Sequence, residues 1–131
     1  MSFEYPEDLK YLDSHEYARI DGDIATIGIT AFAVDQLGDI VFVELPEEGE
    51  TVTQMETFGN VESVKAVEEL VSPVSGIVLE QNTEVLDTPE KIAESPYEEG
   101  WFLKVKLSDT ELDESNFLSA TEYSRQVEGD S

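Results

Sequence analysis

Apolar and polar side chains alternate near the start of the chain in the pattern of a β-hairpin. Residues 25–29 carry an apolar side chain at every second position, and the short segment 17–20 precedes them. The two segments are separated by Asp21-Gly22-Asp23, where the permissive backbone of glycine allows a tight turn. We therefore expect a strand–turn–strand unit over residues 17–29.

After this hairpin the spacing of apolar residues becomes that of a helix. Phe32, Ala33 and Leu37 can lie along one helical face. Thr30 can cap the first turn, because its hydroxyl can accept a backbone N–H, and Gly38 can end the helix. The pattern predicts one short helix early in the chain.

The middle of the chain contains further strand signals. The β-branched, apolar run 40–45 predicts a buried strand, and residues 72–79 predict a turn followed by a strand. Residues 101–107 place apolar side chains on one face of a strand and two lysines on the other. The polar segment 89–99 contains two prolines and is expected to be a loop.

The end of the chain has a helix signature. Ser119-Ala120-Thr121-Glu122 forms a capping box, and Tyr123 and Val127 make an apolar pair one turn apart. Several short strands, one early helix and one C-terminal helix indicate a mainly β protein, either a sandwich or a barrel. No linker or low-complexity segment interrupts the pattern, so residues 1–131 are expected to form a single domain.

The charge of the chain narrows the choice of partners. The chain has 31 acidic and 7 basic residues and a formal net charge of −24. Such a surface repels phosphates and anionic lipids, so we expect no binding to nucleic acid or to membranes. No segment is long and apolar enough to cross a bilayer, and the N-terminus lacks a signal-peptide pattern, which favours the cytoplasm. The acidity serves either solubility or steering toward basic protein surfaces.

The sequence contains no set of residues that is recognisable as a complete catalytic site. There is no cysteine, and the only histidine, His15, lies between Ser14 and Glu16. Neighbouring residues on a strand point to opposite faces, so these three are not expected to form a triad, and His15 is expected at the surface. No spacing resembles a zinc or calcium site. We expect a protein that is not an enzyme and holds no metal.

The segment around Lys65 can be interpreted in two ways. Periodicity alone predicts a helix, because Val61, Val64, Val67 and Val71 would share one face. On that interpretation Lys65 is a solvated lysine that pairs with neighbouring glutamates.

A resemblance favours the other interpretation. The segment 58–66, Phe-Gly-Asn-Val-Glu-Ser-Val-Lys-Ala, resembles the lipoylation hairpin of the H proteins of the glycine cleavage system. Further segments resemble the same family in the same order: 14–16, 25–30, 35–46, 72–76 and 96–101. The resemblance as a whole extends from about Leu9 to about Val127. The resemblance implies a hybrid barrel–sandwich fold with Lys65 at an exposed turn, so we predict strand–turn–strand here.

The resemblance also implies a function. Lipoate would be attached to Lys65 by a lipoate ligase or lipoyltransferase. The chain would then serve, as a monomer, glycine decarboxylase (P protein), the tetrahydrofolate-dependent aminomethyltransferase (T protein) and dihydrolipoamide dehydrogenase (L protein). The loaded arm would be held by Glu16, assisted by Ser14 and Glu69. At Gln36 the family can carry a histidine.

Two alternatives stay open at this point. The chain could be a lipoyl or biotinyl domain of another complex, although biotin carriers usually flank the lysine with methionines. Lipoyl domains of 2-oxoacid dehydrogenases usually carry an aspartate before the lysine and adjoin flexible linkers, and neither feature is present here. It could also be an acidic interaction protein without a cofactor. The intact mass of the native protein separates these alternatives.

Overall fold

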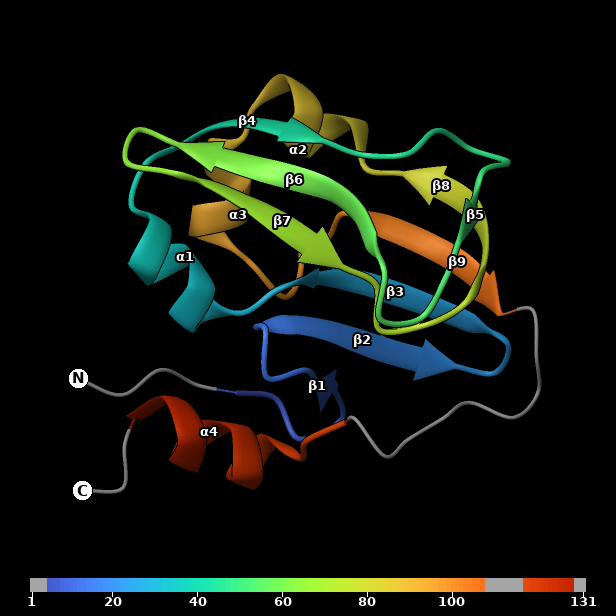
Figure 1. Cartoon of the computed structure of the whole chain (residues 1–131), viewed down its shortest axis with the longest axis horizontal. Coiled ribbons are helices and arrows are strands. Elements are labelled where there is room, and N and C mark those ends of the chain that lie inside the picture. Colours follow the sequence, from blue (N-terminus) through green and yellow to red (C-terminus); the bar gives the residue numbers. More distant parts are fainter. Residues whose placement is uncertain (1–4, 108–116, 129–131) are drawn as a thin grey trace.

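Two antiparallel sheets make up most of the molecule. The computed structural model describes residues 5–107 and 117–128, and Figure 1 shows how its elements are arranged. In the larger sheet the strand order is β1 (Lys10–Tyr11), β2 (Glu16–Asp21), β3 (Ile24–Ile29), β9 (Leu103–Leu107), β8 (Gly76–Gln81) and β5 (Thr51–Val52). The smaller sheet contains β4 (Ile40–Glu44), β6 (Thr57–Ser63) and β7 (Val67–Val71). The mainly β fold agrees with the expectation.

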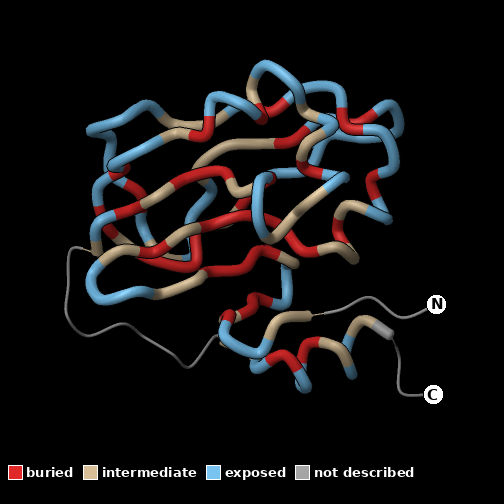
Figure 2. The backbone as a smooth tube through the Cα atoms, turned by 180° about the vertical axis from the view of Figure 1, so that it is seen from behind, coloured by how far each residue is buried: buried red, intermediate tan, exposed pale blue. Residues whose placement is uncertain are grey.

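The hydrophobic core lies between the two sheets. Ile27 of β3 and Val105 of β9 are buried in the same cluster as Val61 of β6 and Leu70 of β7. Figure 2 shows where buried residues lie along the backbone. Burial of apolar side chains from both sheets stabilises the sandwich, at roughly 1.5–3 kcal/mol for each fully buried large side chain.

The predicted β2–β3 hairpin is confirmed. Asp21 pairs with Ile24, and Gly22 takes a positive φ of 66° in the turn between them. A residue with a side chain would be strained in that conformation. The register carries residues 16–21 alongside residues 24–29 and so determines where Glu16 lies in the site described below.

Both predicted helices are present. In α1 (Ala31–Leu37) the Thr30 hydroxyl accepts the Ala33 N–H, and the Gly38 N–H bonds to the Val34 carbonyl. In α4 (Ala120–Glu128), Ser119 and Glu122 form the capping box in both directions. Within the described residues, no helix has the length and apolar character needed to cross a membrane.

The predicted loop over residues 89–99 is partly wrong. This segment contains the helix α3 (Glu90–Glu94), and α2 (Thr83–Asp87) precedes it. Ile92 of α3 is buried in the main core. That burial stabilises a helix too short and too polar to be evident from its own pattern.

The strand predicted over residues 40–45 is present as β4 but is only partly buried. Ile40 and Val43 face the core, whereas Val41 and Phe42 are about half exposed. The pairing with β6 shifts between Ile40 and Phe42, so a bulge places these two residues on the outside.

The segment around Lys65 is strand–turn–strand, as the resemblance implied. Strands β6 and β7 pair in antiparallel register, with Val61 opposite Glu68. Val61 and Leu70 face the core, and β6 also pairs with β4. These long-range contacts decide against the helix that periodicity alone predicts.

Candidate functional site

The turn between β6 and β7 presents Lys65 at the surface. Ser63 organises this turn: its Oγ accepts the backbone N–H groups of Lys65 and Ala66, each at 3.1 Å. The backbone N–H of Ser63 also donates to the Ala66 carbonyl at 2.8 Å. Ser63 is buried, while Val64, Lys65 and Ala66 are exposed. The lysine therefore lies on a short, internally bonded turn. Ser63 was not predicted as part of the site, because its role depends on backbone contacts that form only in the folded turn.

The connection between α1 and β4 supports the same turn. The Val64 N–H donates to the Asp39 carbonyl at 3.1 Å. The Lys65 side chain passes Gly38, where a Cβ would lie 3.5 Å from Lys65 Cε. In the described part of the chain, Lys65 forms no ion pair, so its ammonium remains available.

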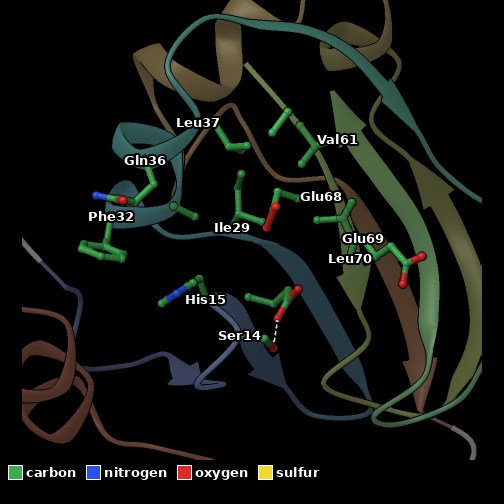
Figure 3. Close-up of a pocket in the computed structure, with 13 residues that line it drawn as sticks. Ser14, His15, Ile29, Phe32, Gln36, Leu37, Val61, Glu68, Glu69 and Leu70 are labelled. Carbon is green, nitrogen blue, oxygen red and sulfur yellow. Dashed lines mark hydrogen bonds between the residues drawn. The ribbon is translucent and has the colours of Figure 1, made fainter. Parts of the chain in front are cut away.

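A cleft of about 370 Å³ lies between the start of β2, helix α1 and the β6–β7 hairpin (Figure 3). Ala66, next to Lys65, lines it near one end of β7, and Glu16 lines it beside Val71 at the other end. Its lining combines polar and apolar side chains in similar measure. The lining residues are Ser14, His15, Glu16, Ile29, Phe32, Ala33, Gln36, Leu37, Val61, Ala66, Glu68, Glu69 and Leu70.

Glu16 is a buried acid in this cleft. One carboxylate oxygen accepts a hydrogen bond from Ser14 Oγ, and the other accepts the Val71 N–H at 2.9 Å. Burial raises the pKa of Glu16 to about 7, although both hydrogen bonds oppose the rise. The carboxylate links β2 to the end of β7. The structure therefore brings the predicted residues Ser14 and Glu16 into direct contact.

The His15 ring is bonded to Tyr123 and not to Ser14 or Glu16, so these three neighbours form no triad. Its Nδ1 lies 2.8 Å from Tyr123 Oη in α4, and Tyr123 Oη lies 2.6 Å from Thr30 Oγ1. His15 has a positive φ of 83°, and its ring lies against Phe32 at a centroid distance of 5.0 Å. The expectation of a surface histidine is wrong, because these contacts leave His15 half-buried, and burial lowers its pKa.

The two neighbouring acids of β7 point in different directions. Glu68 pairs with the inward-facing Val61 and extends into the cleft, whereas the Glu69 carboxylate points away from it (Figure 3). Glu69 accepts a hydrogen bond from Thr57 Oγ1 at 3.3 Å. Glu69 thus borders the cleft without aiming its carboxylate into it. The alternation of side chains along a strand explains the difference.

Comparison with known proteins gives a consistent result. The family model described as glycine cleavage H-protein matches residues 9–130. A glycine cleavage system H protein of a Cyanothece species is 64% identical over 130 residues, covering 98% of this chain and 99% of that protein. One from Acaryochloris marina is 60% identical over 130 residues, covering 98% of this chain and all of that protein.

A solved structure shows the same fold. The crystal structure of a glycine cleavage system H protein from Mycobacterium marinum has a TM-score of 0.86 and 42% sequence identity. The match covers 93% of this chain and 98% of that one. The family match and these relatives span nearly the whole sequence. The chain belongs to the glycine cleavage H-protein family.

Proposed function

We propose that Lys65 carries a lipoyl group, joined by an amide to its Nζ. The observation that carries this proposal is the position of the lysine: exposed on a rigid turn, with a cleft that begins at the next residue. The cleft fits such a group. Ile29, Leu37 and Val61 offer apolar walls for a hydrocarbon arm, and Glu16 offers a carboxylate for a cationic end.

The family membership supports the role of a shuttle. When attached, the lipoyl group would supply the chemistry, taking up the aminomethyl group of glycine at the P protein, presenting it to the T protein and being reoxidised by the L protein. The chain itself would be the shared substrate of these three enzymes and catalyse none of the steps. Its residues would present the arm, orient it and exclude water.

The cleft residues would hold the loaded arm. An aminomethyl group on sulfur ends in a primary amine, which is cationic at neutral pH and needs an acceptor when it leaves water. Glu16 is buried and faces this space, and Ser14 holds one of its oxygens. We propose Glu16 as the main partner of the amine, with Ser14 assisting.

A β7 acid would complete this site. Glu69 can assist only after exchanging its hydrogen bond with Thr57, whereas Glu68 already extends into the cleft. We therefore propose that Glu68 contributes more than Glu69 to binding of the amine.

The attachment is tested by mass spectrometry of the native protein and its peptides. A lipoyl adduct on the peptide with Lys65, and on no other lysine, is the expected result. Lys65→Arg keeps the charge and should abolish glycine cleavage with little change in stability, because the side chain is exposed. A biotinyl adduct, no adduct, or full activity of Lys65→Arg would refute the proposal.

A further inference from the structure

Exposed apolar side chains gather beside the turn that holds Lys65. Within residues 5–107 and 117–128, seven large hydrophobic side chains are exposed. Four of them belong to this turn, to β7 or to the neighbouring strand β4, and they are Val41, Phe42, Val64 and Val67. Isolated exposed apolar residues are common, but a group of them bordered by polar residues is typical of a protein-interaction site.

The register places Phe42 and Val67 on one face of the smaller sheet. Phe42 pairs with Glu62, and Glu62 pairs with Val67, so the three form a row across β4, β6 and β7. Val43 and Val61 point to the core, so the row lies on the opposite, outer face. We call the row, with Val64 in the adjoining turn, the outer docking face.

The outer docking face is surrounded by negative charge, which favours a partner with a basic surface. Strands β4, β6 and β7 contain no lysine or arginine. Glu44 and Glu69 extend the outer face beyond the row, and Glu62 lies within it. An apolar centre among carboxylates fits a protein surface with an apolar depression and basic side chains around it.

We infer that the outer docking face binds the enzyme that acylates Lys65, an inference that rests on the proposed function. That enzyme must bring a reactive carbonyl to roughly 3–3.5 Å from Lys65 Nζ, so it must cover the turn. Val67 is two residues from Lys65, at most about 7 Å along the chain. Enzymes that act on the far end of a finished arm have no such requirement.

The chemistry of acylation also requires the enzyme to contact the turn that holds Lys65. Lys65 Nζ loses a proton and attacks the carbonyl carbon of a lipoyl adenylate. A C–N bond forms, the C–O bond to the adenylate breaks, and AMP leaves with the electron pair. The transferred proton goes to a base on the enzyme. The structure shows no base hydrogen-bonded to Nζ among the described residues, so the bound enzyme must supply one.

The test compares two double variants of the unmodified chain. Phe42→Ser with Val67→Ser removes the apolar part of the outer docking face. Ile77→Ser with Leu79→Ser is the matched control, because these β8 residues are 48% and 43% exposed, against 51% and 58% for the first pair. Each is acylated by a lipoate–protein ligase with lipoate, ATP and Mg²⁺. The first variant should lose about tenfold or more in kcat/KM, mainly through KM, and the control about twofold or less.

A second measurement separates docking from misfolding. Each variant is lipoylated to completion, and the reduction of its lipoyl disulfide by NADH, catalysed by dihydrolipoamide dehydrogenase, is measured. The Phe42 and Val67 variant should then match the parent. Equal ligase kinetics for both double variants, or an equal loss with the dehydrogenase, would overturn the docking inference alone. Failure of the parent chain to be acylated at Lys65 would overturn the proposed function, and the docking inference with it.

Discussion

At the scale of single residues, the burial of Glu16 has two opposing effects: it fixes the position of the carboxylate, and it makes ionisation of that carboxylate unfavourable. Its carboxylate is buried and shared between Ser14 and the Val71 backbone, which makes it a precise acceptor. The same burial raises its pKa to about 7, so ionisation costs stability. In the proposed function, an incoming ammonium group would offset that cost.

A first prediction concerns the pH dependence of stability. The pKa of Glu16 is about 7 in the folded state against 4.5 when exposed, so between these values the folded chain binds more protons. Its contribution to the free energy of unfolding must therefore fall as pH rises through this window, by up to about 3 kcal/mol. Glu16→Gln removes the titration, and the glutamine Oε1 can still accept the Val71 N–H while its NH2 group donates to Ser14 Oγ. The free energy of unfolding of this variant, relative to that of the parent, should therefore increase as the pH rises from 5 to 8.

Urea unfolding of the unmodified chains at pH 5 and pH 8 measures this difference. Glu62→Gln is the control, because Glu62 is exposed on the outer face and should change little between the two pH values. A parent and a Glu16→Gln variant that respond equally to pH would contradict the prediction.

A second residue-scale prediction concerns the loaded arm. Glu16→Gln should leave lipoylation and reoxidation intact but shorten the lifetime of the isolated loaded form by about tenfold or more, since a charge-assisted hydrogen bond contributes roughly 1.5–3 kcal/mol. The release of ammonia and formaldehyde without the T protein measures this lifetime. Glu68→Gln should shorten it more than Glu69→Gln, because only Glu68 extends into the cleft. An unchanged lifetime in Glu16→Gln removes Glu16 from the mechanism.

At the scale of elements, the C-terminal helix is connected to the cleft. Tyr123 of α4 is fully buried, and its hydroxyl contacts both His15 and Thr30. His15 adjoins Ser14 and Glu16, and Thr30 caps α1, which forms another wall of the cleft. The His15 carbonyl also accepts the Thr30 N–H at 3.0 Å. Through these bonds α4 holds two cleft-forming segments in place.

A third prediction tests this connection with two buried tyrosines. Tyr123→Phe leaves His15 and Thr30 without their shared partner and should cost about 1–3 kcal/mol of stability. It should also change the NMR signals of the His15 ring. Tyr11→Phe is the matched control: Tyr11 stacks on Tyr123 at 4.9 Å, but its hydroxyl bonds to the Pro6 carbonyl at 2.7 Å. Tyr11→Phe should leave the His15 signals in place, and equal shifts in both variants would disprove a specific connection.

At the scale of the whole molecule, the charge balance is extreme. Within residues 5–107 and 117–128, the basic residues Arg19, Lys91, Lys104 and Lys106 each lie within 4.0 Å of an acid. Such exposed pairs contribute little stability, typically under about 1 kcal/mol each. Around Lys65, the charged residues nearest in the sequence are Glu62, Glu68 and Glu69, and this negative charge favours approach of a basic partner.

A fourth prediction follows for association rates. Raising the salt concentration across the physiological range should slow association with any partner enzyme whose contact surface is basic, because salt screens the attraction. Stopped-flow measurements at two salt concentrations give the rates, and dissociation should change less. Rates insensitive to salt for the P, T and L proteins would show that the acidity serves solubility alone.

The sequence by itself determined the features that depend on neighbouring residues. Thr30 and Ser119 predict the starts of α1 and α4, because a helix cap is a hydrogen bond between residues two or three positions apart. The β2–β3 hairpin depends on Gly22 and on local alternation. The composition determined the acidity, and the resemblance around Lys65 indicated the family.

Only the tertiary structure decided the features that depend on distant residues. Residues 61–71 form strands rather than a helix because Val61 and Leu70 are buried in a core built from both sheets. Glu16 is bonded to a residue 55 positions away, and His15 to one 108 positions away. A local pattern holds no information on such partners, and propensity is too weak, at about 1 kcal/mol or less per residue, to resist their packing. The cleft beside Lys65 exists because three segments far apart in the sequence meet there.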